Sequence, residues 1–319
     1  MKSFASAPGK TILFGEHFVL YGCPALSMAI NLYSKVFAEK RQNSIIQIYS
    51  KNLNIIERFN KNSSNNKVLK SIKIAADEVL KLTNQNLGLN LTIESEIPPA
   101  AGLGSSAATA VSTIASVAEL LNLNITKDKI IELAFSPEKF IHGKPSGIDH
   151  TTSTLGGIIY YEPNLGFKKF DVMIDIQALI AYSGIPKATK EQIIKVKDYL
   201  EKNKERKNRI LNEFNEIVSS AVEALKNKDL EMLGNLMNQN QKLLKEIKVS
   251  NPILDKIVET AVKNGALGAK ITGAGGGGSI IALVTNENKE KVFKKLKEVS
   301  KEVYFIKIDF HGVKSGKLS

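Results

Sequence analysis

An alternating segment followed directly by a helical segment is the clearest pattern of hydrophobic and polar positions in the chain. In residues 89–96, leucine and isoleucine alternate with polar side chains, which is the period of a half-buried strand. In residues 111–121, apolar side chains recur at helical spacing, and neither proline nor glycine interrupts them. The pattern therefore predicts a strand, a glycine-containing turn and a long helix.

The same two periods divide the rest of the chain. Apolar strand-like runs, interrupted by glycine, are predicted within residues 3–22. Further strands are predicted at residues 30–38, 45–49, 158–161, 170–174, 178–182, 279–284 and 303–310. Helices are predicted at residues 68–80, 130–135, 189–202, 209–226, 230–245, 252–263 and 289–300. Ser136 and Pro137 suit an N-cap and a first helical position, so a helix is expected to restart there. The polar segment 60–67 predicts a mobile surface loop.

Composition and charge narrow the class of protein. The 319 residues suffice for two domains, and 43% hydrophobic with 24% charged residues is typical of a globular protein. The net charge of +12 comes from lysines spread along helical segments, which favours solvated helix faces over a nucleic-acid site. Residues 1–7 lack the apolar core of a signal peptide and no apolar run has membrane-spanning length, so we expect a cytoplasmic protein. The single cysteine, Cys23, excludes an internal disulfide and a cysteine-based zinc site.

The turn at residues 98–108, with the sequence PPAAGLGSSAA, is the first candidate site. Gly102 and Gly104 let the backbone approach a ligand closely. The small Ser105 and Ser106 leave the first helical turn open, so that its unpaired N–H groups and positive dipole end can face an anion. The segment is not a Walker A loop, because no lysine follows the second glycine. On physical grounds alone, serine capping of a tight turn is an equal alternative.

Two further glycine-containing segments carry candidate chemistry. Residues 8–26 include Lys10, Glu16 and His17, although a lone lysine or histidine is more often a surface or turn residue. The segment KITGAGGGGS at residues 270–279 lies between a helical pattern and an apolar strand pattern. A flexible linker is therefore disfavoured, and a close backbone approach to substrate or phosphate is favoured.

The segment EKFIHGKPSGID, at residues 138–149, contains a carboxylate that suits phosphoryl transfer. Transfer to a hydroxyl needs a carboxylate that orients or deprotonates it, and a nearby cation. Asp149 is the candidate for this carboxylate. Aspartate is also a common helix N-cap, so a capping role is the alternative.

Together these segments resemble the three motifs of the GHMP kinases, the family of galactokinase, homoserine kinase, mevalonate kinase and phosphomevalonate kinase. Residues 98–108 match PPxAGLGSSAA, residues 7–25 match APGKxxLxGEHxVxxGxPA and residues 270–278 match KxTGAGGGG. The second pattern is the form of the mevalonate kinase branch. Galactokinases carry Asp-Tyr after the histidine, where this chain has Phe18 and Val19.

The resemblance implies a fold and an activity. It implies an α+β, two-domain GHMP kinase fold, with a ribosomal protein S5 domain 2-like N-terminal domain at residues 1–165 and a ferredoxin-like C-terminal domain at residues 166–319. The site is expected in the cleft between them. The implied reaction is ATP-dependent phosphorylation of mevalonate to 5-phosphomevalonate, in the isoprenoid pathway, with Mg²⁺ as the metal ion.

The resemblance also implies a role for individual residues. Asp149 is expected to be the catalytic carboxylate and Lys10 its cation, with Ser106 and Glu138 as the Mg²⁺ ligands. The residues expected to bind the substrate are Glu16, His17, Ser146, Thr189, Gly273 and Ala274. The residues expected to bind ATP are Pro99, Ala101, Gly102, Leu103, Gly104, Ser105, Ser106 and Ala107.

Several alternatives stay open. A phosphomevalonate kinase would need extra cations around the phosphate of its substrate, and Lys187 is the one evident candidate in the segment SGIPKATK, which resembles the VPRST stretch of mevalonate kinases. A non-catalytic ligand-binding paralogue is disfavoured by the joint presence of Lys10, Glu138 and Asp149. A nucleic-acid-binding protein is disfavoured because no cluster of aromatic residues and arginines is present. The sequence leaves the oligomeric state open, with a homodimer as one alternative.

Overall fold

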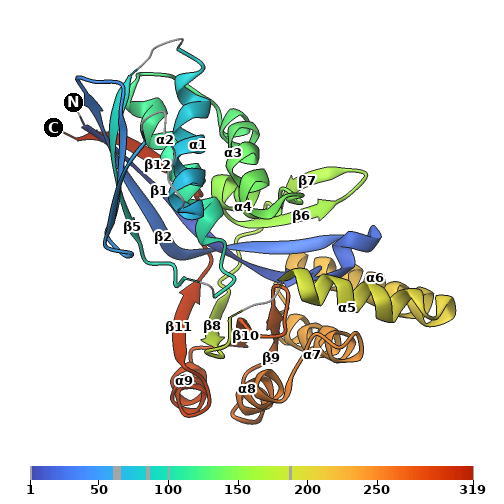
Figure 1. Ribbon diagram of the computed structural model, residues 1–319. Helices are drawn as coiled ribbons and strands as arrows, with labels where there is room; N and C mark the ends of the chain where they lie inside the picture. The colour runs from blue at the N-terminus through green and yellow to red at the C-terminus, as the bar shows by residue number, and fades with distance from the viewer. Residues whose placement is uncertain (1, 60–65, 84–86, 100, 187–188, 319) are drawn as a thin grey trace.

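The computed structural model of the chain describes residues 2–59, 66–83, 87–99, 101–186 and 189–318. It contains two sheets, each covered by helices, and the predicted α+β class is confirmed (Figure 1). The two chain termini lie side by side at one edge of the first sheet. None of the described helices is long and apolar enough to cross a bilayer.

The first sheet has eight strands in the described part of the chain. They are β1 (Lys2–Phe14), β2 (Ala25–Arg41), β3 (Ile46–Ser50), β4 (Ile55–Phe59), β5 (Gly88–Ser95), β6 (Ile158–Glu162), β7 (Gly166–Lys169) and β12 (Lys314–Leu318). The order is β12-β1-β2-β5-β3-β4, and the β6–β7 hairpin pairs with β2. All pairs are antiparallel except β3 with β5.

Four helices and one short 3₁₀-helix accompany this sheet in the described residues. They are α1 (Lys67–Leu80), α2 (Ser105–Leu120), α3 (Lys127–His142), α4 (Ile148–Leu155) and η1 (Phe18–Tyr21). The central helix α2 packs against β1 and β2 and is buried on almost every side, because its residues are mostly small or apolar. Ser3 Oγ donates to Ser116 O at 2.7 Å, which satisfies one polar group in that contact. This bond lies near the C-terminal end of α2, whereas the opposite end of the helix lies beside Lys10 of β1, whose N–H donates to Leu103 O at 2.9 Å.

The second sheet has four antiparallel strands in the order β11-β8-β10-β9. Its strands are β8 (Gln177–Tyr182), β9 (Gly268–Thr272), β10 (Ser279–Val284) and β11 (Glu302–Lys307). Its helices are α5 (Thr189–Glu201), α6 (Lys204–Lys226), α7 (Leu230–Glu246), α8 (Pro252–Lys263) and α9 (Lys289–Lys297). When these strands are numbered along the chain, their order across the sheet is 4-1-3-2. Helices lie in the first and last of the connections between them, which is the ferredoxin-like arrangement.

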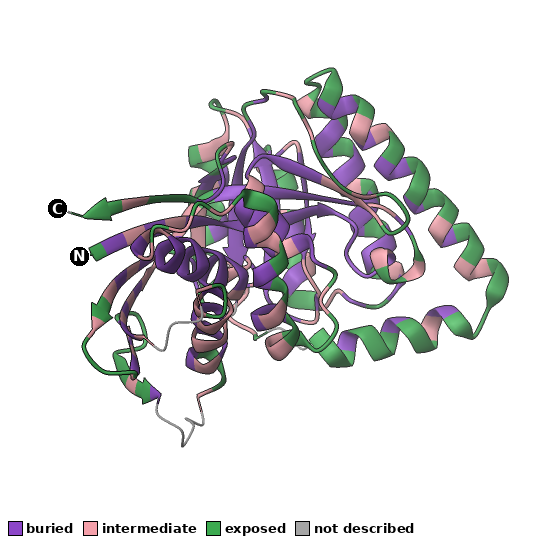
Figure 2. Ribbon diagram, turned by 90° about the horizontal axis from the view of Figure 1, so that it is seen from above, coloured by how far each residue is buried: buried purple, intermediate pink, exposed green. Residues whose placement is uncertain are grey.

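The buried apolar residues of both sheets form one large cluster. It includes Val36 of β2 and Leu283 of β10, so the two sheets share a core. Figure 2 shows buried residues running through the centre of the molecule, whereas α5 and α6 at its right edge carry many exposed residues. Because the shared core resists relative movement of the two sheets, a site between them can be held rigidly.

Hydrogen bonds join β1 of the first sheet directly to β9 of the second. The Thr272 hydroxyl lies 2.9 Å from the Thr11 hydroxyl, and Thr272 Oγ1 accepts a hydrogen bond from Ile12 N at 3.1 Å. All of these groups are buried, so each bond is shielded from competing water. The start of the chain is thereby held against the strand that leads into the last glycine segment.

A buried ion pair extends this junction. The Lys270 ammonium of β9 donates to Glu16 Oε1, just beyond the end of β1, and neither side chain is exposed to solvent. Burial raises the pKa of the Glu16 carboxyl and lowers the pKa of the Lys270 ammonium, while the attraction between them opposes both shifts. Each charge is therefore tolerable in the interior only because the other is present.

Several boundaries differ from the sequence predictions. The predicted helix restart at Ser136 is wrong, since α3 runs without interruption from Lys127 to His142 with Pro137 inside it. The predicted strand at residues 170–174 is also wrong, because the sheet pairing of that hairpin ends at Lys169. Strands β4, β7, β9 and β12 were not predicted. Most of the predicted surface loop at 60–67 lies outside the described residues.

The predicted division of the chain at residues 165 and 166 stays a prediction. Two strands that follow this position, β7 and β12, pair within the first sheet. The last strand returns to β1 after the second sheet is complete, so the two ends of the chain lie in one sheet.

Replacement of Lys270 by methionine tests the ion pair. The variant leaves a buried carboxylate without its cation, so we expect a loss of about 3–5 kcal/mol in the free energy of unfolding. Adding Glu16→Gln removes the lone charge and should restore part of this loss, because a neutral amide costs less to bury. Chemical denaturation of both variants measures the effect. A loss below about 1 kcal/mol in the single variant would contradict the assigned role of the pair.

Candidate functional site

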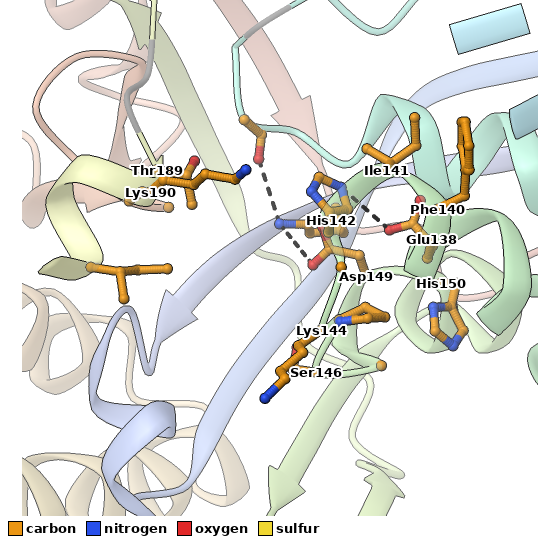
Figure 3. Close-up of a pocket in the computed structure, with 18 of the residues that line it drawn as sticks. Glu138, Phe140, Ile141, His142, Lys144, Ser146, Asp149, His150, Thr189 and Lys190 are labelled. Atoms are coloured by element: carbon orange, nitrogen blue, oxygen red, sulfur yellow. Dashed lines mark hydrogen bonds and ion pairs between the residues drawn. The ribbon is translucent and has the colours of Figure 1, made fainter. Parts of the chain in front are cut away.

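Two adjoining cavities lie between the sheets. The larger has a volume of about 730 Å³ and the smaller about 230 Å³. They share residues from the first and last motif regions, from the loop and helix start around Asp149, and from α5 (Figure 3), namely Lys10, Lys144, Ser146, Asp149, Thr189, Ile193, Gly273 and Ala274. The structure therefore brings together segments that are up to 264 residues apart in the chain, from Lys10 to Ala274.

An ion pair occupies the junction of the two cavities. Lys10 Nζ lies 3.1 Å from Asp149 Oδ1 and 3.5 Å from Gly102 O (Figure 3). The lysine side chain is 6% exposed and the aspartate side chain 33%, so the carboxylate faces the cavity while the ammonium lies behind it. The ammonium thus balances and orients a carboxylate that a ligand can reach.

The phosphate turn holds Lys10 in place. Lys10 N donates to Leu103 O at 2.9 Å, which ties β1 to the turn. Gly104 has φ +73°, and a Cβ added there would lie 2.8 Å from Lys10 Cγ. Glycine is therefore required at this position for two reasons, namely the backbone conformation and the close approach of the lysine side chain.

The alternative role of Asp149 as a helix cap is wrong. The N-cap of α4 is Gly147, and Asp149 is the second residue of the helix. A carboxylate in the first turn is stabilised by the positive end of the helix dipole, but it does not close the helix end. Its side chain is consequently available to the cavity.

The larger cavity has a surplus of positive groups among the described residues that line it. Its lysines are Lys10, Lys67, Lys144 and Lys190, and its acidic residues are Glu138, Asp149 and Glu191. The N-terminus of α2 lies beside Gly102, and no side chain caps its first turn. Such a helix end attracts phosphate groups through its free N–H groups and its dipole.

The predicted ATP-binding residues lie along this turn, and of these described residues Gly102 alone lines one of the two cavities. Ala101, Leu103 and Ala107 are buried, and Ala101 O accepts a hydrogen bond from Ser279 Oγ at 2.9 Å. Ser105 and Ser106 form the first turn of α2 and are half-buried, while Pro99 is exposed. Hydrogen bonds to the carbonyls of Ala101 and Leu103 anchor the turn, and Gly102 is its residue that lines the larger cavity.

The predicted metal ligands provide oxygen donors of the kind that Mg²⁺ prefers. Glu138 of α3 is 2% exposed and lines the larger cavity, where its Oε2 lies 3.7 Å from His142 Nε2 (Figure 3). Ser106 offers a hydroxyl at the start of α2. No group of three or more histidine, cysteine or acidic residues in the described part of the chain could hold a metal ion by itself. This donor set fits Mg²⁺, which takes few protein ligands and completes its shell with water and phosphate oxygens.

The smaller cavity ends at Glu16 and His17. His17 Nε2 lies 2.8 Å from Ala274 O, and since a carbonyl can only accept, this nitrogen carries the proton. Burial lowers the pKa of His17, which keeps the ring neutral. Its φ of +62° is unusual for a residue other than glycine, and such backbone strain is typical of functional positions.

The last glycine segment closes the cavities from the side of the second sheet. Gly273 and Ala274 line both of them. Gly276 has φ +68°, and an added Cβ would lie 2.3 Å from Gln192 Nε2 of α5. Gly276 N donates to Val249 O at 2.7 Å, so the segment is fixed between α5 and the loop before α8. It is a constrained turn and not a flexible linker.

Sequence reasoning missed some residues of the site. Lys144 lines both cavities, Lys190 lines the larger one, and Lys270 supports Glu16, but a lysine gives no signal of such a role in a chain rich in lysine. His150 follows Asp149 and lines the larger cavity, with an edge contact to Phe135. Lys144 belongs to the segment EKFIHGKPSGID at residues 138–149, and His150 directly follows that segment. Lys187 and Ala188, of the VPRST-like stretch, lie outside the described residues.

Comparisons with known proteins agree on one family. Residues 66–157 match the family model described as GHMP kinases N terminal domain, and residues 221–302 match that described as GHMP kinases C terminal. A mevalonate kinase of Pyrococcus furiosus is 38% identical over 309 residues, which cover 91% of each chain.

Solved structures give the same result. The crystal structure of the Methanococcus jannaschii mevalonate kinase has a TM-score of 0.86 and 33% identity, and the match covers 96% of this chain and 98% of that one. The structure of L. major mevalonate kinase in complex with R-mevalonate has a TM-score of 0.84 and 30% identity, with 95% of both chains covered. These matches confirm the predicted two-domain fold.

The pH dependence of stability tests the burial of His150. Burial lowers the pKa of this ring from 6.5 to about 4, against the opposing attraction of Asp149. The unfolded chain therefore takes up a proton first as the pH falls below 6.5, and folding stability is lost between pH 6.5 and 4. We expect this group to contribute a loss of about 3 kcal/mol over that range, which His150→Asn should abolish. Denaturant titrations of both proteins at several pH values measure it, and equal pH slopes would contradict it.

Proposed function

The chain belongs to the GHMP kinase family, and we propose that it uses the Lys10–Asp149 pair to phosphorylate mevalonate at the expense of ATP. The products are 5-phosphomevalonate and ADP, in the isoprenoid pathway. The observation that carries the proposal is the 3.1 Å ion pair where the two cavities meet. A donor held in one cavity and an acceptor held in the other would meet at this pair.

Asp149 is the group that acts on the acceptor alcohol. Its carboxylate accepts the hydrogen bond of the primary hydroxyl, and so orients or deprotonates the oxygen that attacks the γ-phosphorus. Lys10 holds that carboxylate and places a positive charge beside the oxygens that gain charge during transfer. The bond formed joins the alcohol oxygen to phosphorus, the bond broken joins phosphorus to the β–γ bridging oxygen, and ADP leaves.

The larger cavity is the proposed ATP site. The phosphates would lie against the N-terminus of α2 and the backbone at Gly102, where free N–H groups and the helix dipole favour anions. The lysines that line this cavity add a positive field for a polyanionic ligand. Gly273 and Ala274 would close over the transferred group from the second sheet.

Mg²⁺ is the proposed metal ion, held by Glu138 and Ser106 together with phosphate oxygens. Bound there, the ion would neutralise charge on the β- and γ-phosphates. The chain itself supplies a buried carboxylate and a hydroxyl at the mouth of the phosphate site.

The smaller cavity is the proposed mevalonate site. Its volume of about 230 Å³ suits a small acid, and its walls combine polar residues at Glu16, His17, Ser146 and Thr189 with aliphatic side chains. We further propose a cytoplasmic location. A homodimer stays a prediction.

A substrate panel tests the proposed function. Purified protein with ATP is assayed for ADP release with mevalonate, phosphomevalonate, homoserine and galactose. We expect mevalonate to be preferred over phosphomevalonate by at least about 10³-fold in kcat/KM, because the wrong ligand leaves polar groups of the site mispaired. Faster turnover of phosphomevalonate would refute the assignment of substrate and leave the fold intact.

Asp149→Asn tests the catalytic role of the carboxylate. The amide keeps the shape and removes the charge, so turnover should fall by roughly 10²-fold or more while the protein stays folded. Asp128→Asn is the matched control, since Asp128 is also an acidic residue in the first turn of a helix but lies on the exposed start of α3. Near-normal turnover of Asp149→Asn would remove Asp149 from the mechanism.

A further inference from the structure

The groups at the closed end of the smaller cavity cannot neutralise a negatively charged substrate. His17 is neutral, and its one N–H donates to Ala274 O. Glu16 places Oε1 against Lys270, which is fully buried behind it. The proton on His17 is therefore already used within the protein, and the ring has no second proton to donate to the carboxylate of mevalonate.

The polar atoms left at this end are hydrogen-bond acceptors. Glu16 Oε2 and His17 Nδ1 are buried, and neither receives a hydrogen bond from the described protein atoms. Buried acceptors are stabilised by a donor, and the hydroxyl groups of a ligand are donors. This end therefore suits an alcohol and repels a carboxylate.

The carboxylate of the substrate must therefore bind elsewhere in the smaller cavity. Of the described residues that line it, Lys10 and Lys144 are the two lysines. Lys10 already balances Asp149 at the transfer point. Lys144 lies in the short loop between α3 and α4, forms no ion pair with any described residue, and extends away from Asp149 in Figure 3.

We propose that Lys144 binds the carboxylate of the substrate and so makes the enzyme specific for a hydroxy acid over the corresponding neutral alcohol. This assignment rests on the proposed mevalonate kinase function. The ammonium provides a charge-assisted hydrogen bond to one carboxylate oxygen, at a distance from the reacting pair that leaves the primary hydroxyl free to reach Asp149. Lys144 is thus a substrate-binding residue and takes no part in phosphoryl transfer.

The remaining walls agree with the same ligand class. Ile12, Val19 and Ile148 belong to a small apolar cluster that is separate from the main core, and all three line the smaller cavity. An aliphatic wall favours the methyl branch of the substrate. The smaller cavity thus offers a cation, acceptors for hydroxyl groups and an apolar wall. These features together suit a small branched hydroxy acid.

Lys144→Met tests the proposal, because methionine keeps much of the length of the side chain and removes its charge. We expect KM for mevalonate to rise by about 10- to 100-fold, with kcat and KM for ATP within about twofold, since a charged hydrogen bond made equally in ground and transition states is lost. With 3-methylpentane-1,3,5-triol, in which a hydroxymethyl group replaces the carboxylate, the variant and the wild type should give equal kcat/KM. Lys144→Arg should recover most of the affinity for mevalonate.

Lys291→Met, on the exposed face of α9, is the control for removal of one positive charge. An unchanged KM for mevalonate in Lys144→Met would overturn the proposal, and so would a rise in KM for ATP instead. A larger effect from Lys190→Met would place the carboxylate beside α5 and would also contradict it. Failure of the wild type to use mevalonate at all would refute the proposed function itself, which distinguishes the two failures.

Discussion

The buried ion pair between Glu16 and Lys270 is the constraint on which the geometry of the site depends. It lies where β1 of the first sheet meets β9 of the second, beside the hydrogen bonds that join Thr11 and Ile12 to Thr272. Two full charges are stable there only together, since removal of either partner leaves the other buried in a medium of low polarity. The pair consequently fixes the relative position of two segments that lie more than 250 residues apart in the chain.

The catalytic arrangement follows from this junction. Lys10 lies on β1 a few residues before Glu16, and Gly273 directly follows β9, which carries Lys270. The ion pair of Glu16 with Lys270 therefore also holds Lys10 and Gly273 in position relative to each other. The turn before α2 packs onto Lys10 from the opposite side, through Leu103 and Gly104. Asp149 then meets Lys10 from the first turn of α4. The ion pair at the junction of the cavities is therefore supported by rigid elements of both sheets, which is what accurate positioning of a reacting group requires.

The residues alone predicted the local parts of this site, and the family resemblance supplied the long-range pairing of Lys10 with Asp149, but other long-range contacts were missed. Glycine spacing and small side chains were sufficient to predict the turn before α2, because backbone conformation and helix ends depend on neighbouring residues. The ion pair of Glu16 with Lys270 could not be predicted, since only the folded sheets bring these residues together. The tautomer of His17 depends on the carbonyl of Ala274 in the same way. The restart expected at Pro137 was wrong because tertiary packing kept α3 continuous through a residue that disfavours helix interiors.

If the junction of the two cavities presents one primary alcohol to ATP, the chemical structure of the reaction product reveals it. Wild-type protein is incubated with ATP, Mg²⁺ and ¹³C-labelled mevalonate, and the product is examined by ³¹P and ¹³C NMR. We expect a single phosphate ester on the primary oxygen, with one ADP formed for each ester. A phosphate on the tertiary oxygen or the carboxylate, or release of inorganic phosphate without any phosphorylated product, would contradict it.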